Sequence, residues 1–197
     1  MLPLRDNIPA RRPPVVTVSL IIVNAAAFLH LWSQGDRRFE RAVWALGFVP
    51  ARLYAAIHDP GTDPGVWLTS LSSMFLHGGW LHLLANMWML WIFGDNVEDR
   101  LGRGRYLVFY LACGLAAVAA QYLARPLAPV PLVGASGAIA GVLGAYLLLF
   151  PRARILTLVP IFIFFYFVEL PAVLFLGLWL LVQFLNGTAQ MTAGAPA

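Results

Sequence analysis

The stretch Gly134-Ala135-Ser136-Gly137 opens an apolar segment that runs to Phe150, and it places one serine among small residues at the start of an expected helix. The first turn of a helix has backbone N–H groups without intrahelical partners, and the helix dipole makes this end positive. An oxyanion formed beside Ser136 would therefore meet oriented donors in a low-dielectric setting, as acyl transfer requires. Such a stretch also serves close helix packing in membranes, so both interpretations stand at this point.

The composition of the 197-residue chain is that of a membrane protein. Apolar residues make up 60% of it and charged residues 11%, whereas soluble domains carry about 25% charged residues. Five apolar segments are candidates for transmembrane helices, since a bilayer takes about 20 helical residues. They cover residues 15–32, 67–93, 106–123, 132–150 and 155–185. The expected fold is all-α, a polytopic membrane helical bundle forming one domain over residues 1–197, with an N-terminal tail at 1–14 and a linker at 186–197.

The charges indicate an orientation in the membrane. The net charge of +4 comes from 13 basic residues, all arginine, against nine acids. Arginines before the first segment, after the second and after the fourth would share one side, and these are Arg5, Arg11, Arg12, Arg100, Arg103, Arg105, Arg152 and Arg154. The positive-inside rule assigns that side to the cytoplasm, so the N-terminus is expected there and the linker at 186–197 outside. So few charges fix topology, and no nucleic acid is expected as a partner.

The first outer loop, residues 33–66, is too long for a simple connector and mixes aromatic residues with charges. This mixture suits a partly helical segment in the membrane interface, where tryptophan and tyrosine are favoured. Packing on the outer ends of the transmembrane helices would explain it equally well. The sequence leaves both possibilities open.

Three polar residues, His77, His82 and Asn86, lie in the second apolar segment. His82 and Asn86 are four residues apart, so on a helix they share one face. Polar side chains at membrane depth face the bundle interior or a wet cavity, and hydrogen bonding between helices is one sufficient reason for them. No nearby Cys, Asp or Glu completes a set of metal ligands with the two histidines, so no metal is expected.

Small residues recur at intervals of four on the fourth segment, at Gly137, Gly141 and Ala145, and Ser136, Ala140 and Gly144 form an adjacent stripe. A stripe of this kind lets helix backbones approach closely. We expect it to pack against the second segment and to bring Ser136 and Asn86 into one cavity. The single cysteine, Cys113, lies in an apolar run and is expected to be a small packing residue.

The order and spacing of three motifs make the chain resemble the rhomboid intramembrane serine proteases over nearly its whole length. The motifs are His77-x4-His82-x3-Asn86, Glu98-x-Arg100-Leu101-Gly102 and Gly134-Ala135-Ser136-Gly137. The resemblance implies that Ser136 is the catalytic nucleophile. It also implies that His82 and Asn86 stabilise the oxyanion together with the backbone N–H of Ser136. Gly134, which has no side chain, would let a substrate backbone approach.

The same resemblance implies a function and a location. The expected activity is cleavage of transmembrane segments of membrane-protein substrates within the lipid bilayer, without a cofactor. The expected location is a bacterial-type plasma membrane. Glu98 and Arg100 are expected to brace a loop on the cytoplasmic side and to take no part in the chemistry.

One part of the family pattern is missing. Rhomboids pair their serine with a histidine on a sixth transmembrane helix, and none of the histidines here is left for that place. The four are His30, His58, His77 and His82. We therefore expect a fragment without the histidine base and with little activity of its own. The alternatives are an inactive rhomboid-like protein that binds transmembrane segments and, less in keeping with so few intramembrane charges, a transporter.

One acid, Glu169, lies deep in the fifth apolar segment, two residues before Pro171. An intramembrane acid is a functional candidate by default, and a proline removes one helical hydrogen bond beside it. We expect Glu169 to have a hydrogen-bonded structural or gating role.

Overall fold

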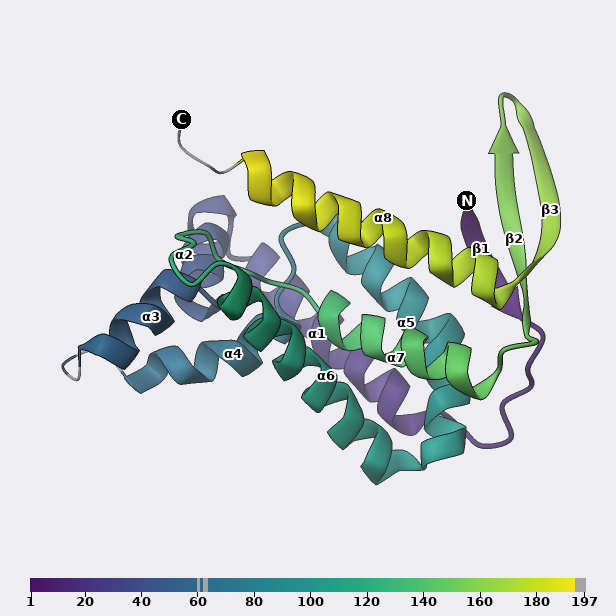
Figure 1. Ribbon diagram of the computed structural model, residues 1–197, viewed down its shortest axis with the longest axis horizontal. Helices are drawn as coiled ribbons and strands as arrows, with labels where there is room; N and C mark the ends of the chain where they lie inside the picture. The colour runs from purple at the N-terminus through teal and green to yellow at the C-terminus, as the bar shows by residue number, and fades with distance from the viewer. Residues whose placement is uncertain (60, 62–63, 194–197) are drawn as a thin grey trace. The chain divides into compact units, whose positions relative to one another are not determined.

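The structure is a computed structural model that describes residues 1–59, 61 and 64–193, and it is mostly α-helical. Its elements follow one another, with η marking 3₁₀ helices, as β1 (Leu2–Asp6), α1 (Val15–Trp32), α2 (Asp36–Leu46), α3 (Pro50–His58), η1 (Pro64–Leu68), α4 (Thr69–Ser72), η2 (Ser73–Phe75), α5 (Trp80–Leu101), α6 (Arg103–Ala124), α7 (Ser136–Leu149), β2 (Arg154–Ile161), β3 (Phe164–Pro171) and α8 (Ala172–Ala193) (Figure 1). The chain forms two compact units, residues 10–142 and residues 1–9 with 143–197.

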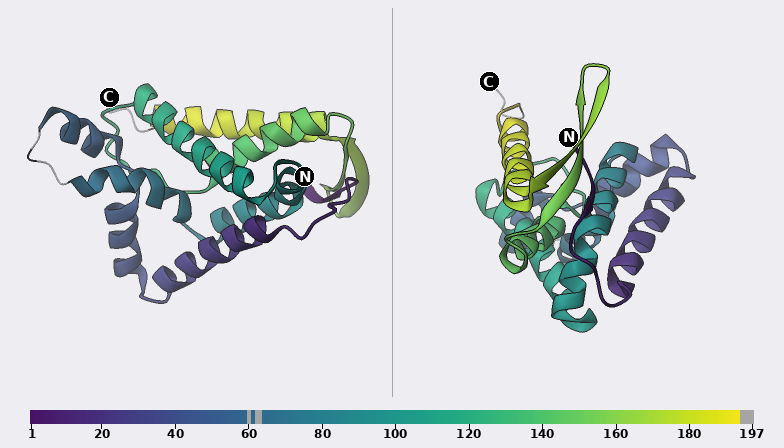
Figure 2. Two further views of the ribbon diagram at one scale, coloured as in Figure 1. Left: turned by 90° about the horizontal axis from the view of Figure 1, so that it is seen from below. Right: turned by 90° about the vertical axis from the view of Figure 1, so that its right-hand side faces the viewer.

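In the unit of residues 10–142, helix α1 coincides with the first predicted segment and lies against α5 (Figure 2). Pro14 precedes α1, and proline suits the start of a helix because its φ is fixed and it needs no N–H partner. Gly94 of α5 makes the close approach possible. A Cβ at Gly94 would lie 2.9 Å from Cγ2 of Thr17 and 2.8 Å from the hydroxyl oxygen of Tyr106, which leaves no room for a side chain.

A carboxylate from the far end of α5 caps the N-terminus of α1. Glu98 is 2% exposed. Its Oε1 accepts a hydrogen bond from the backbone N–H of Val16 at 2.9 Å. Its Oε2 accepts from both the backbone N–H and the hydroxyl of Thr17, each at 2.8 Å. The structural role expected of Glu98 thus takes the form of an anion at a helix N-terminus, where the dipole favours negative charge.

The outer loop and the second predicted segment are divided into several short elements. Helices α2 and α3 confirm that the loop of residues 33–66 is partly helical. The elements η1, α4 and η2 occupy residues 64–75, and α5 begins only at Trp80. Gly78 and Gly79 lie just before this start, and two successive glycines disfavour a continuous helix. The helix of the second segment is therefore shifted toward the C-terminus of its predicted range.

Two helices among the described residues, α1 and α6, are both long and apolar enough to cross a bilayer. Helix α5 is long enough, but its last two turns carry charges, at Asp95, Glu98, Asp99 and Arg100. Helix α7 and the part Ala172–Val182 of α8 are apolar but shorter. The predicted number of five transmembrane helices is therefore not confirmed by length and composition alone.

In the unit of residues 1–9 and 143–197, the predicted fifth segment is not one helix. Its first part forms the antiparallel hairpin β2–β3, and β1 pairs with β2 to give the strand order β1-β2-β3. Residues 155–168 are rich in β-branched and aromatic residues, which favour strands, and Pro160 and Pro171 oppose a continuous helix. Helix α8 begins at Ala172 and runs to Ala193, through residues predicted to be a linker. Residues 194–197 of that linker lie outside the described part of the chain.

The structure also corrects the environment expected for Glu169. This residue belongs to β3, near the base of the hairpin, and its side chain is 61% exposed. Its carboxylate lies 3.9 Å from the guanidinium of Arg154 on β2. The prediction that Glu169 lies deep in a transmembrane helix is wrong, because the strand-forming residues before it turn the segment into a hairpin.

Candidate functional site

Main-chain hydrogen bonds hold the segment that leads into Ser136, the first residue of α7. Phe48 and Leu132 exchange two hydrogen bonds, of 3.0 and 2.7 Å. The N–H of Gly134 donates to the carbonyl of Ser73 at 2.9 Å. These bonds fix the chain on both sides of residue 133, so the start of α7 is positioned by the α2–α3 junction and by η2. Sequence reasoning missed Ser73 and Phe48, because their contribution is made by backbone atoms.

Gly134 lies directly against the imidazole of His82. Its φ is +126°, a conformation that residues with a side chain rarely adopt. A Cβ at this position would lie 2.7 Å from both Cε1 and Nε2 of His82, closer than real Cβ contacts allow. Because successive Cα atoms are about 3.8 Å apart, the Cα of Ser136 is at most about 7 Å from that of Gly134. The structure therefore brings Gly134 and His82 into contact and leaves Ser136 beside them.

Asn86 follows His82 by one turn of α5, so the predicted helical relation of these two residues is correct. The Asn86 side chain is 6% exposed, and its Nδ2 donates to the carbonyl of His82 at 2.9 Å. A side-chain amide has two N–H groups, so one bond to its own helix leaves a second donor. The common cavity of Ser136 and Asn86 stays a prediction.

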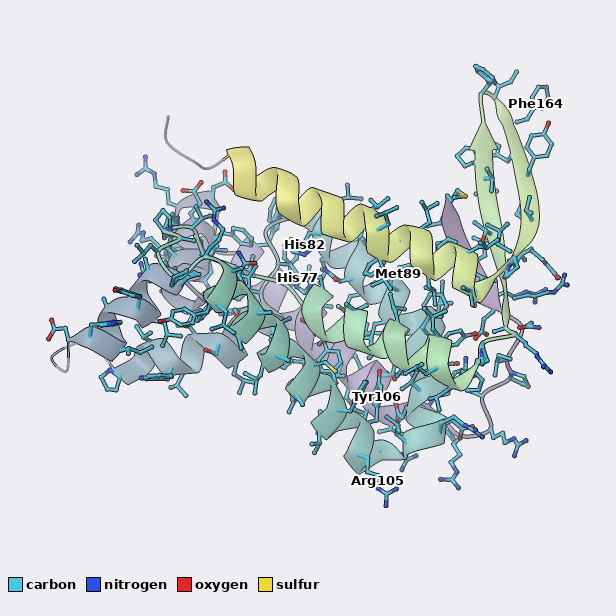
Figure 3. The ribbon with its side chains drawn as sticks, in the orientation of Figure 1. His77, His82, Met89, Arg105, Tyr106 and Phe164 are labelled. Carbon is cyan, nitrogen blue, oxygen red and sulfur yellow. The ribbon has the colours of Figure 1, made fainter. Side chains whose placement is uncertain are left out.

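His77 is a buried neighbour of His82. The two ring centroids are 5.1 Å apart, with the planes inclined at 68°, and Figure 3 shows the two labelled side chains close together. The His77 side chain is 2% exposed, and neither of its ring nitrogens has a hydrogen-bond partner among the described residues. Buried polar groups without a partner are rare in proteins. The edge-to-face contact restricts the orientation that the His82 ring can take.

Gly137 and Gly141 of α7 face α6, whereas the sequence predicts that their stripe lies against the second apolar segment. A Cβ at Gly137 would collide with Ala117, and one at Gly141 would collide with the side chain of Cys113. Both collisions are with residues of α6. The stripe does permit a close helix approach, as predicted, but the partner is the third apolar segment. Cys113 is the packing residue that the sequence suggested.

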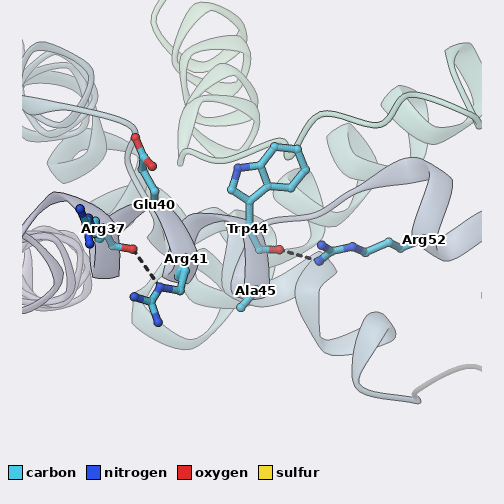
Figure 4. Close-up of a pocket in the computed structure, with 6 residues that line it drawn as sticks. All are labelled: Arg37, Glu40, Arg41, Trp44, Ala45 and Arg52. Atoms are coloured by element: carbon cyan, nitrogen blue, oxygen red, sulfur yellow. Dashed lines mark hydrogen bonds between the residues drawn. The ribbon is translucent and has the colours of Figure 1, made fainter.

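A pocket of about 800 Å³ lies over α2 and α3, which are distant in sequence from the predicted site residues (Figure 4). It is lined by Arg37, Glu40, Arg41, Trp44, Ala45 and Arg52. Arg52 donates to the carbonyl of Trp44, and Nε of Arg41 donates to the carbonyl of Arg37 at 3.3 Å. The lining contains none of the predicted site residues. Its arginines and tryptophan are the residue types expected of a helical segment at a membrane interface.

A model of the rhomboid domain matches residues 64–194, which include every predicted site residue and all three motifs. The chain belongs to the rhomboid family. Membership makes it a membrane protein and agrees with the resemblance seen in the sequence. The matched region begins at η1, so α1 to α3 lie before it.

Known rhomboid proteins match shorter parts of the chain. The rhomboid protease GluP of Bacillus subtilis is 43% identical over 83 residues, which are 42% of this chain and 16% of GluP. YdcA of the same organism, named as a candidate rhomboid protease, is 37% identical over 114 residues, 55% of this chain and 57% of YdcA. The mitochondrial rhomboid protein 1 of Saccharomyces cerevisiae is 36% identical over 96 residues, 47% of this chain and 28% of that protein. The chain thus spans just over half of YdcA and less of the other two. Since these relatives come from bacteria and mitochondria, the bacterial plasma membrane stays a prediction for this chain.

Proposed function

We propose that Ser136 is the nucleophile of an intramembrane serine endopeptidase that cleaves transmembrane segments of membrane proteins. The contact between Gly134 and the His82 imidazole carries this proposal, because it puts a serine at the positive end of α7 beside the polar residues of α5. Membership in a family with protease-named relatives supports it independently.

The length of α7 supports a site below the membrane surface. Helices α1, α5, α6, α7 and α8 are the proposed transmembrane set. With 14 residues, α7 is about 21 Å long, shorter than the hydrocarbon core of about 30 Å. If Arg152 marks the membrane surface at its C-terminal end, Ser136 lies several ångströms inside the opposite face. Irregular backbone at such depth is tolerated where protein surrounds it, and the bonds of Leu132 and Gly134 meet that requirement.

The proposed reaction begins with attack of the Ser136 hydroxyl oxygen on the carbonyl carbon of the scissile peptide bond, while a base accepts the hydroxyl proton. The carbonyl oxygen becomes an oxyanion. The second N–H of Asn86, the His82 ring and the backbone N–H of Ser136 are its proposed donors. The C–N bond then breaks, the amine leaves with the proton, and water hydrolyses the remaining ester. Absence of a side chain at Gly134 lets the substrate backbone approach.

The base is proposed to be a histidine that residues 1–197 do not contain. His30 shares a hydrogen bond of 2.9 Å with Gln34, and His58 shares one of 2.8 Å with the carbonyl of Tyr54, so each ring is bonded to a residue four positions away in sequence. His82 is assigned to the oxyanion, and His77 contacts His82. Without the base, only the acceleration from binding and from the oxyanion donors remains.

A cleavage assay with a single-span substrate in liposomes tests this assignment. It compares the polypeptide of residues 1–197, the same sequence extended through a sixth span, and the Ser136→Ala variant of the extended form. We expect the extended form to cleave, and the other two to be slower by about a thousand-fold or more. The matched control is Ser19→Ala, since the Ser19 hydroxyl is exposed and donates to the carbonyl of Val15 in its own helix. Gly134→Ala should lower cleavage strongly because its Cβ displaces the His82 ring.

Two outcomes would contradict the proposal in different ways. Cleavage by residues 1–197 that depends on Ser136 would mean that His77 or His82 acts as the base. If neither form cleaves but both bind a transmembrane peptide, the protein is an inactive rhomboid-like binder. That second function is favoured by the lack of an available histidine in the chain.

A further inference from the structure

The far end of the β2–β3 hairpin is a continuous apolar surface. No residue from 155 to 168 is charged. Side chains 162–168 are all exposed, and the large ones are Phe162, Ile163, Phe164, Phe165, Tyr166 and Phe167. A strand with one face on a core alternates buried and exposed side chains, but β3 shows no such alternation. The fold of the unit therefore does not account for these aromatic residues.

The base of the hairpin, in contrast, is packed and paired. Ile155 and Thr157 of β2 are fully buried, and β1 pairs with β2 only as far as Leu158. From Val159 to the turn the hairpin projects beyond β1, over a length of about 10 Å at the usual rise of a strand. Figure 3 shows the labelled Phe164 side chain at the far end of this projection.

The turn itself carries an unusual residue. Phe162 and Ile163 connect the paired residues Ile161 and Phe164, and Phe162 has a φ of 53°. Two-residue hairpin turns favour glycine or asparagine where φ is positive, because a side chain there is strained. Phe162 is 98% exposed, so it gains no packing within the chain in return. An outlier of this kind points to a functional constraint.

We infer that the hairpin tip, residues 159–166, inserts into the interfacial layer of the bilayer that holds the protein's own helices. Tyrosine is favoured at this layer, and interfacial segments bury phenylalanine and aliphatic side chains in it. The projection of about 10 Å matches the depth of about 5–10 Å at which interfacial segments bury their apolar face. Arg5 of β1 and Arg154 of β2, near the base, are both exposed, with Arg154 3.9 Å from the Glu169 carboxylate, and they complement the anionic lipid headgroups through which the tip passes.

Hydrogen bonding limits the tip to the interface. Among the described residues, β3 has no strand partner on its outer edge, and β2 has none on its outer edge beyond Leu158. Such edges cannot lie in the hydrocarbon core, where no water satisfies them. Pro160 pairs with Phe165 of β3 but lies in the part of β2 that β1 does not reach, and it has no N–H to leave unsatisfied, which suits an edge strand. The alternative is that a second copy of the chain pairs with the free edge of the hairpin. The experiment below distinguishes this pairing from insertion into lipid.

Spin labels on the full chain in phosphatidylcholine vesicles, with and without phosphatidylglycerol, test the insertion. In a Cys113→Ala background, the label is attached at Phe164→Cys or, independently, at Ile163→Cys. The control is Arg152→Cys, an exposed position of the same unit outside the hairpin. At 163 and 164 we expect more frequent collision with oxygen than with a water-soluble nickel chelate, and the reverse at 152.

Labels at 163 and 164 that meet the nickel chelate as often as the label at 152 would overturn the inference. Spectral broadening at 164 that disappears on dilution with unlabelled protein would also overturn it, because this result shows two paired copies. Both readouts are independent of proteolysis, so they do not depend on the role of Ser136.

Discussion

Replacing Glu98 by alanine should destabilise the protein far more than replacing its neighbour Asp99. The Glu98 carboxylate is buried and accepts three hydrogen bonds, two from backbone N–H groups at the start of α1 and one from the hydroxyl of Thr17. Asp99 accepts one hydrogen bond from the N–H of Arg11 at 3.2 Å and lies 4.0 Å from the guanidinium of Arg12. The two residues are adjacent in sequence but differ in what their loss leaves unpaired.

The expected magnitude follows from those contacts. A hydrogen bond to a charged group contributes about 1.5–3 kcal/mol, and an anion at a partly buried helix terminus up to about 2 kcal/mol. Removing Glu98 also removes the cost of burying its charge, which offsets part of the loss. We expect Glu98→Ala to lower the free energy of unfolding by about 2–4 kcal/mol. For Asp99→Ala, which breaks one hydrogen bond and a long pair with the exposed guanidinium of Arg12, we expect about 1 kcal/mol or less.

Denaturation in detergent, followed by helical circular dichroism, measures both variants. A double-mutant cycle with Thr17→Val isolates the hydroxyl bond to Glu98, for which we expect a coupling of about 1 kcal/mol. If Glu98→Ala and Asp99→Ala lower stability equally, the carboxylate does not stabilise α1 and the reasoning fails. A coupling of zero would mean that the hydroxyl of Thr17 contributes through another partner.

Gly141→Ala should lower the unfolding free energy by about 1–3 kcal/mol because its Cβ collides with Cys113, whereas Gly144→Ala, with nothing within 4 Å, should leave it unchanged or raise it by up to about 1 kcal/mol. Equal effects in thermal denaturation would argue against the close approach of α7 to α6. Single cysteines at Arg38→Cys and Arg103→Cys, in a Cys113→Ala background, should react with a membrane-impermeant reagent from opposite sides of the membrane. Labelling of both from one side would refute the predicted topology.

The helices that the sequence predicts well are those whose ends are marked by residues of special conformation. Helix α1 matches its predicted range, between Pro14 and a glycine of positive φ at Gly35. Helix α6 follows Gly102, which also has a positive φ, and lies close to its predicted range. Apolar runs between such markers leave little choice of structure.

Residues 155–185 were mispredicted because hydropathy does not distinguish a strand from a helix. The run is mostly apolar, with Glu169 as its one charged residue, so counting its length predicts a transmembrane helix. The contrary signals were its β-branched and aromatic residues and the prolines at Pro160 and Pro171. When these β-branched and aromatic residues and the two prolines are taken into account, the segment divides into a hairpin followed by the helix that begins at Ala172.

For the candidate site, the motifs assigned Gly134 and His82 to one site, and the structure brings these two residues into contact, but neither that contact nor the supporting ones could be read from the sequence. Ser73 accepts the bond from Gly134 through its carbonyl, and every residue has a carbonyl. The partners of Glu98 are 81 and 82 positions away, and two of its three bonds come from backbone N–H groups. Contacts of this kind leave no pattern in the residue types.

The hydrogen bonds before α7 are made by main-chain atoms. The position of Ser136 therefore does not depend on which side chains the preceding loop carries. Phe48, Leu132 and Gly134 take part through N–H and carbonyl groups that any residue except proline possesses. Only Gly134 is further restricted, by its φ and by His82. The other positions of this loop can therefore accept different residue types. Substitutions in this loop can change its surface while the position of Ser136 is kept.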